Sequence, residues 1–275
     1  MEQLFKAVVL GVVQGLTEFL PISSTAHLRI IPSFFGWKDI GASYTAVIQV
    51  GTMIAIIIYF WKDLLNMVKA FVLSLRQKDF KSKDTRLLLQ IIFGTIPIVI
   101  FGFLFKDIIR HQFRSMYIMA GSLIFFSFMI FVAEKVTKKK INIGMLGYKE
   151  ALIVGFFQAL ALIPGASRSG STISGGFFLN MTREDAARFS FLLSIPAVLL
   201  SGCYELYSQR ADLLSGETAV LSLVIATVVS GIIGYWSIGF LLSFIKRKSL
   251  MLFIAYRILF GILILILLFM NVINN

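Results

Sequence analysis

Gln14-Gly-Leu-Thr-Glu-Phe-Leu-Pro-Ile-Ser-Ser-Thr-Ala-His27 is a polar stretch in an otherwise strongly apolar chain. Between Thr17 and His27 it holds one carboxylate, four hydroxyls and one imidazole. A second polar stretch, Pro164-Gly-Ala-Ser-Arg-Ser-Gly-Ser-Thr172, follows about half a chain later. Two such stretches in one apolar chain predict a single site built from both.

The composition predicts an integral membrane protein made of helices. Of the 275 residues 58% are hydrophobic and only 15% are charged, and the mean hydropathy is +0.88. A soluble domain needs more polar surface than this, and several uncharged runs reach the ~18 residues needed to cross a hydrocarbon core. The net charge of +12 lies in short links between these runs. The preference of cytoplasmic links for Lys and Arg explains that placement, so nucleic acid is not an expected partner.

Each half of the chain begins with a broken helix. Residues 4–20 form a helix that is too polar to span, and it ends at Pro21. Ser23, Ser24 and Thr25 are typical caps for a second short helix that runs to Phe35. The second half repeats the pattern with helices at 148–163 and 169–179 around a break at Pro164 and Gly165. Such breaks are tolerated at membrane depth only inside protein or beside a wet cavity, which predicts two re-entrant hairpins.

Six spans complete the predicted fold. They lie at 44–61, 87–105, 115–133, 189–207, 219–245 (bent between Gly231 and Gly239) and 249–273. The links 62–86, 134–149 and 246–248, with Arg183 and Arg188, hold 17 positive residues, and the opposite side holds 7, which include Lys38, Arg110 and Arg114. This bias places the first group in the cytoplasm and both termini outside.

The two halves form an inverted repeat within a single integral membrane domain, 1–275. One repeat covers about 1–133 and the other about 148–273. Three spans per repeat is an odd number, so the second copy is inverted. Gly11, Gln14 and Leu16 match residues 144 positions later, and Pro21-Ile-Ser-Ser matches Pro164-Gly-Ala-Ser after a one-residue slip. Inverted repeats with broken helices bring both breaks to the midplane of the bilayer.

The second break has the composition of an anion site. Arg168 has no acidic neighbour within ten residues, and it is flanked by Ser167, Ser169 and Gly170. A glycine-containing turn that opens a helix presents backbone N–H groups to an anion, and the guanidinium matches phosphate oxygens. An Arg that merely extends to the lipid headgroups is the alternative.

The first break has the composition of a reactive site. Gln14 and Glu18 share a helix face, and a buried carboxylate must be paired, metal-bound or protonated. A purely structural ion pair of Glu18 with Arg168 or Arg257 is the alternative. His27 is a candidate acid or base. The hydroxyls of Ser23, Ser24 and Thr25 are either caps or candidate nucleophiles, and the residues themselves do not choose among them.

These motifs resemble those of the bacterial undecaprenyl-diphosphate phosphatase family. The resemblance rests on Gln14-x-x-x-Glu18, Pro21-Ile-Ser-Ser-Thr-Ala-His27 and Pro164-Gly-Ala-Ser-Arg-Ser-Gly-Ser-Thr172, and it extends to Phe189–Pro196 and Tyr256-Arg257. It implies hydrolysis of undecaprenyl diphosphate to the monophosphate in the bacterial cytoplasmic membrane, recycling of the cell-wall lipid carrier, and bacitracin resistance. It also implies a divalent cation, Mg²⁺ or Ca²⁺.

The resemblance carries functional roles to Glu18, His27, Ser167, Arg168 and one or more of Ser23, Ser24 and Thr25, and the hypothesis built on it assigns each role further. Glu18, Ser24, His27 and Arg168 are expected to be catalytic, with Ser24 or a water as the nucleophile. The expected phosphate-binding residues are Ser23, Thr25, Ser167, Arg168, Ser169 and Gly170. The metal is assigned to Glu18 and Gln14. Gln14 stands where the family often has Glu, so Glu18 alone supplies the carboxylate. Arg257 is expected to support Glu18 or to bind phosphate. The partners are a prenyl diphosphate lipid, the membrane and a second copy of the chain, with the active site facing outward.

A transporter or lipid flippase is the rival hypothesis. Inverted repeats and a midplane site are typical of transporters. The feature that distinguishes the two is the cluster of Glu, His and hydroxyl groups opposite Arg168, which translocation does not require.

Overall fold

The computed structural model describes residues 2–37, 41–106, 108, 115–210 and 217–273. This part of the chain holds eleven α-helices, and its only β-type pairing is the isolated bridge between Ile141 and Met181. Lys38, Arg110, Arg114 and the second histidine of the chain, His111, lie outside the described residues.

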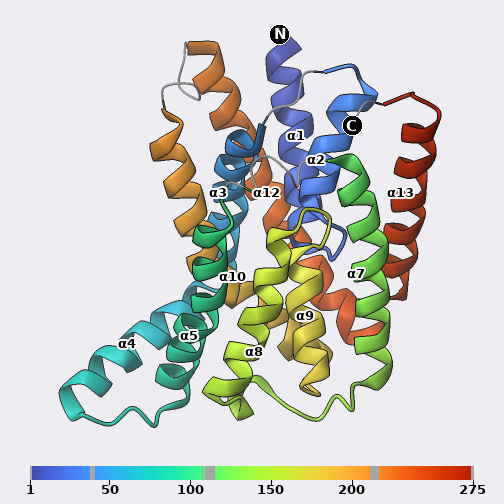
Figure 1. The fold of residues 1–275 in the computed structure, drawn as a ribbon. Helices are drawn as coiled ribbons and strands as arrows, with labels where there is room; N and C mark the ends of the chain where they lie inside the picture. Colours follow the sequence, from blue (N-terminus) through green and yellow to red (C-terminus); the bar gives the residue numbers. More distant parts are fainter. Residues whose placement is uncertain (1, 38–40, 107, 109–114, 211–216, 274–275) are drawn as a thin grey trace.

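The helices follow the predicted order (Figure 1). The first half contains α1 (Glu2–Phe19), α2 (Ser24–Phe34), α3 (Gly41–Tyr59), α4 (Trp61–Gln77), α5 (Lys83–Leu104) and α7 (Met116–Val136). The second half contains α8 (Tyr148–Ala159) with the 3-10 turn η3 (Leu160–Leu162), α9 (Arg168–Phe178), α10 (Arg183–Ser208), α12 (Glu217–Arg247) and α13 (Met251–Phe269). A further 3-10 turn, η2 (Ile143–Met145), lies in the link before α8.

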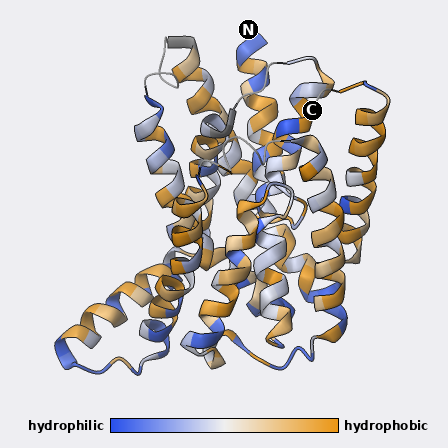
Figure 2. Ribbon diagram, in the orientation of Figure 1, coloured by the Kyte–Doolittle hydropathy of each residue, from blue (hydrophilic) through white to orange (hydrophobic). Residues whose placement is uncertain are grey.

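The prediction of an all-α membrane protein is confirmed. Five helices in the described part are long and apolar enough to cross a bilayer: α5, α7, α10, α12 and α13. The pair α3 and α4 passes the same test together, with a bend of 73° between them, and would make the sixth span. Apolar residues cover most of the outer helices, whereas α9 in the middle is paler (Figure 2).

One predicted segment differs from the structure. The link 62–86 is mostly helical, because α4 continues directly from α3 after the bend and α5 already begins at Lys83. The heptad spacing of Lys62, Lys69 and Arg76 places these cations along one edge of an apolar stripe, as in a helix that lies along the membrane surface. The segment expected to bend between Gly231 and Gly239 is one continuous helix, α12, and the bend stays a prediction.

The two hairpins run in opposite directions and meet in the middle of the molecule. Helix α1 begins at the end of the molecule where both termini lie, whereas α8 begins at the opposite end (Figure 1). Each packs on a spanning helix from the other half, α1 on α12 and α8 on α5. Glycines permit both contacts: a Cβ on Gly11 would lie 2.7 Å from the Ala226 carbonyl oxygen, and one on Gly155 would collide with the Gly94 carbonyl.

The second helices of the two hairpins correspond residue by residue at a constant offset of 144. Helices α2 and α9 begin at Ser24 and Arg168, and they end at Phe34 and Phe178. The residues before them, Ser23 and Ser167, both have left-handed φ angles, 75° and 70°. The predicted one-residue slip is therefore wrong, and Ser24 corresponds to Arg168. The correspondence supports an inverted repeat, and the repeat limits stay a prediction.

Candidate active site

Arg257 of α13 ties the two breaks together. The side chain is completely buried, and it donates to Pro21 O (3.2 Å) at the first break and to Gly165 O (3.0 Å) and Ala166 O (3.1 Å) at the second. Its Nε donates to Ser127 Oγ of α7 at 2.8 Å. Arg257 does not contact Glu18, so the pairing of these two residues that the sequence suggested is wrong. The arginine instead satisfies carbonyl groups that a broken helix leaves without partners.

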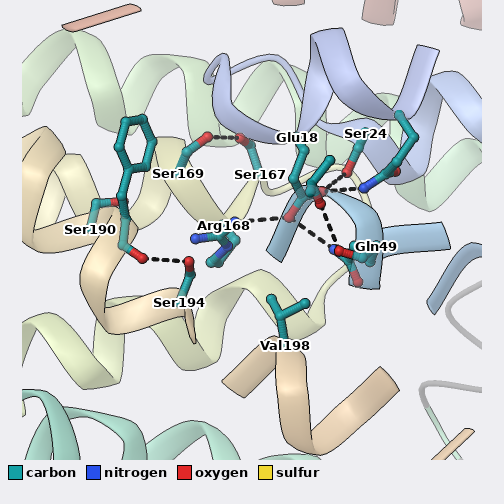
Figure 3. A network of polar contacts seen from close by, with 12 residues as sticks. Glu18, Ser24, Gln49, Ser167, Arg168, Ser169, Ser190, Ser194 and Val198 are labelled. Atoms are coloured by element: carbon teal, nitrogen blue, oxygen red, sulfur yellow. Dashed lines mark hydrogen bonds and ion pairs between the residues drawn. The ribbon is translucent and has the colours of Figure 1, made fainter. Parts of the chain in front are cut away.

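Glu18 lies at the centre of a polar network between the hairpins (Figure 3). It is 5% exposed. One carboxylate oxygen, Oε1, accepts from Arg168 Nη2 at 2.8 Å and from Gln49 Nε2 at 2.9 Å. The other, Oε2, accepts from Ser24 Oγ at 2.8 Å and from Gln14 Nε2 at 3.0 Å. A carboxylate has about four acceptor positions, and all of them are used.

Arg168 joins the two hairpins through Glu18 and has two further donors that no described residue accepts. Its ion pair with Glu18 is the pairing that the purely structural alternative also predicts. That alternative does not explain why Nε and Nη1 are buried and have no partner among the described residues. In Figure 3 the guanidinium extends from Glu18 toward Ser194 of α10. Buried guanidinium donors without a partner are costly, and an anion with several oxygens satisfies them.

The other predicted phosphate ligands of the second hairpin have structural partners. Ser167 caps α9, where its Oγ accepts from Gly170 N at 3.2 Å. Ser169 Oγ donates to Leu20 O at 3.2 Å, across to the first hairpin. Gly170 leaves little room for a side chain, because a Cβ there would lie 3.0 Å from Ile130 Cδ1. The three residues therefore lie beside Arg168, and each has a contact that shapes or holds the second hairpin.

His27 lies apart from the Glu18 network. The residue is 5% exposed, and its ring contacts Ser23 O through Nδ1 (2.8 Å) and Tyr256 Oη through Nε2 (2.6 Å). Ser24 hydrogen-bonds to Glu18 rather than to His27. Ser23 is buried, whereas Thr25 is exposed on the first turn of α2. The structure therefore brings together Glu18, Ser24, Arg168 and Gln14, and it gives His27 separate partners.

The residues fit a cation only as part of a shared site. No group of three or more His, Cys, Asp or Glu side chains in the described ranges has the arrangement of a metal site. Gln14 Oε1 is nevertheless a buried acceptor without a donor among the described residues, and Nε2 of the same amide donates to Glu18. Mg²⁺ and Ca²⁺ prefer oxygen ligands of this kind, and Mg²⁺ commonly takes several ligands from substrate phosphates.

Sequence reasoning missed three of these residues. Gln49 is the amide inside the predicted span 44–61, where a polar side chain is costly and therefore informative. Ser194 lies in the stretch 189–196 that carries part of the family resemblance. Tyr256 belongs to the Tyr256-Arg257 pair that also carries part of the resemblance, but its contact depends on which helix packs against α2.

Fold and site together define a polytopic membrane protein that has a buried carboxylate, a hydroxyl and an arginine between two re-entrant hairpins. The comparison with known proteins specifies the class. Residues 7–263 match the family described as bacitracin resistance protein BacA, and the chain belongs to that family. An undecaprenyl-diphosphatase of Chloroherpeton thalassium is 50% identical over 98% of both chains. Another, of Chlorobium phaeovibrioides, is 49% identical over 96% of this chain and 97% of its own.

Proposed function

We propose that this protein hydrolyses undecaprenyl diphosphate to undecaprenyl phosphate and inorganic phosphate. This reaction recycles the lipid carrier of the bacterial cell wall, and the same activity underlies bacitracin resistance. The observation that carries the proposal is the Glu18–Arg168 centre, where Arg168 retains two buried donors without a described partner. The relatives at about half identity, which are named for this activity, support it.

The substrate's terminal phosphate is the proposed ligand of Arg168. Phosphoryl transfer depends mainly on positioning and on neutralising charge at the phosphate oxygens. Arg168 Nε and Nη1 supply fixed donors for this purpose. Because the ion pair with Glu18 uses only Nη2, the guanidinium keeps its orientation when phosphate binds.

Ser24 is the proposed nucleophile and Glu18 its base. The Ser24 hydroxyl donates to Glu18 Oε2 at 2.8 Å, the contact expected of an activated nucleophile. In the forward step Ser24 Oγ bonds to the terminal phosphorus, its proton passes to Glu18, and the bond to the bridging oxygen breaks to release undecaprenyl phosphate. Water then attacks the phosphorus of the phosphoserine and the bond from phosphorus to Ser24 Oγ breaks. Ser24 Oγ takes back the proton held by Glu18, one proton of the attacking water is released, and the other stays on the inorganic phosphate. His27 is proposed to exchange protons in this cycle.

A divalent cation is proposed to bind together with the diphosphate. Gln14 Oε1 is one proposed protein ligand. The Glu18 carboxylate is the other and would exchange one of its present donors for the cation, while the diphosphate oxygens and water complete the set. Such a cation neutralises charge on the diphosphate. The experiment is phosphate release with and without chelator, alongside isothermal titration of the cation in the presence of a non-hydrolysable prenyl diphosphonate.

The site is proposed to face outward from the bacterial cytoplasmic membrane. The excess of Lys and Arg in the links 62–86, 134–149 and 246–248 supports this orientation. In a Cys203→Ser background, a membrane-impermeant thiol reagent applied to intact cells is expected to leave Lys138→Cys unlabelled. A homodimer is a further proposal, for which light scattering in detergent is the measurement.

The decisive experiment for the activity uses purified protein in detergent with undecaprenyl diphosphate labelled in its terminal phosphate. We expect release of labelled phosphate, acid-stable label on the wild-type protein after a rapid quench, and no label on Ser24→Ala. A transporter would move the lipid across a vesicle membrane without releasing phosphate. Release without any labelled protein would assign the attack to water and remove Ser24 as nucleophile.

A further inference from the structure

The two nitrogens of His27 have different partners, and these determine the tautomer. Nδ1 lies 2.8 Å from Ser23 O. A carbonyl oxygen only accepts, so Nδ1 carries a hydrogen and donates it. In the neutral ring Nε2 is then the unprotonated nitrogen. The Ser23 carbonyl belongs to the left-handed residue of the first break, so the imidazole is anchored to the hairpin itself.

Tyr256 is hydrogen-bonded to the other ring nitrogen of His27, Nε2. Its hydroxyl lies 2.6 Å from Nε2 and is the donor in this bond, since neutral Nε2 only accepts. The two rings are nearly parallel, with centroids 5.7 Å apart and an interplanar angle of 7°. Phe260, one turn further along α13, stacks on the same imidazole at 4.5 Å. Helix α13 therefore fixes both the plane of His27 and the direction of its basic nitrogen.

The exposure of the pair differs. His27 is 5% exposed, whereas Tyr256 is 41% exposed. Because the Tyr256 hydroxyl is bonded to Nε2 at 2.6 Å, a proton that reaches or leaves this nitrogen passes through that hydrogen bond. Ser24 gives its hydrogen bond to Glu18, so that hydroxyl is not bonded to His27 in this arrangement.

We propose that Tyr256 is the positioning residue of His27. Its hydroxyl keeps the imidazole in the tautomer with a hydrogen on Nδ1 and an accepting Nε2, and it is the group through which His27 exchanges protons. The inference rests on the proposed role of His27 in phosphate release. It explains why a tyrosine on the last helix contacts a hairpin more than two hundred residues away in sequence.

Tyr256→Phe tests the hydroxyl alone, because phenylalanine keeps the ring that stacks on His27. We expect kcat for undecaprenyl diphosphate to fall on the order of tenfold, with KM little changed, because proton transfer is affected and phosphate binding is not. Tyr235→Phe is the matched control: that ring packs on Tyr59 in another part of the molecule, and we expect wild-type turnover. Wild-type kcat in Tyr256→Phe, with His27→Gln impaired, would overturn the proposal.

A double-mutant cycle separates action through His27 from general damage. If Tyr256 acts through His27, Tyr256→Phe adds little to the loss already caused by His27→Gln. Losses that multiply would overturn the proposal.

A spectroscopic measurement distinguishes failure of this inference from failure of the mechanism. His27 and His111 are the only histidines, so the His111→Gln variant labelled with ¹⁵N-histidine reports one imidazole. We expect a protonated Nδ1 and a bare Nε2, and a moved Nε2 signal in Tyr256→Phe. If His27→Gln retains full turnover, His27 has no role in the mechanism, and the Nε2 signal then tests the Tyr256 proposal by itself. A Nε2 signal that moves in Tyr256→Phe supports the positioning role, and one that does not move overturns it.

Discussion

The short second helices of the two hairpins have matching bounds, but the hairpins carry different chemistry. Helices α2 and α9 begin and end at positions 144 apart, after serines with nearly equal left-handed φ angles. At the matched positions, however, Glu18 corresponds to Leu162, and Ser24 corresponds to Arg168. The repeat thus supplies a symmetric frame in which one arm carries the carboxylate and the hydroxyl and the other carries the cation. Function comes from the positions at which the copies differ.

The largest effect is expected from Glu18→Gln. The amide cannot accept a proton from Ser24, and it leaves Arg168 buried without a counter-charge. Loss of a general base costs about 10²- to 10⁴-fold, so we expect phosphate release to fall by at least a hundredfold.

Leu162→Met is the matched control for Glu18→Gln, because it changes the corresponding position of the other hairpin without adding charge. We expect turnover close to wild type. Equal losses in the two variants would mean that the hairpins are not chemically distinct, and normal activity in Glu18→Gln would remove the carboxylate from the mechanism.

A smaller loss is expected from Arg168→Lys, which keeps the charge on the second hairpin and removes the planar guanidinium with its several donors. An ammonium can still pair with Glu18, but it cannot also supply the donors at Nε and Nη1. Loss of one such donor typically costs about 10²- to 10³-fold in rate, and we expect kcat/KM for undecaprenyl diphosphate to fall by about a hundredfold. Arg188→Lys, in the partly exposed pair with Asp63, is the control that should leave kcat/KM unchanged. Full activity of Arg168→Lys would show that charge alone suffices.

The sequence predicts the two hairpins and their repeat better than it predicts the side-chain contacts between them. Polar residues in apolar runs marked both hairpins, and their spacing marked the repeat, because burying polar groups in lipid is costly wherever it occurs. The same argument did not identify the partner of Arg257. A buried arginine needs acceptors, and only the packing of α13 between the breaks reveals that these are the carbonyls of Pro21 and Gly165. Nor did it place α4, whose charges resembled those of a link.

Arg257→Met is expected to affect stability more than chemistry, because it removes the side chain that both hairpins share. The carbonyls at Pro21, Gly165 and Ala166 lose their donor, and each buried unsatisfied group costs about 1–3 kcal/mol. We expect a thermal midpoint in detergent that is lower by several degrees, with phosphate release reduced in proportion to the folded fraction. Arg247→Met, at the exposed end of α12, is the control and should melt like the wild type. An unchanged midpoint for Arg257→Met would mean that the breaks hold their shape without this arginine.

The smallest effect separates Gln14 from its counterpart Gln158. Both are fully buried at equivalent positions, but Gln14 donates to Glu18, whereas neither amide atom of Gln158 has a partner among the described residues. Replacing an unpaired buried polar group by an apolar one of similar shape is neutral or stabilising. We therefore expect Gln158→Met to keep wild-type phosphate release and to melt at the same temperature or a few degrees higher, whereas Gln14→Met loses activity. If Gln158→Met also lost activity, the second hairpin would take part in the chemistry through more than Arg168, and the division of labour between the two arms would be wrong.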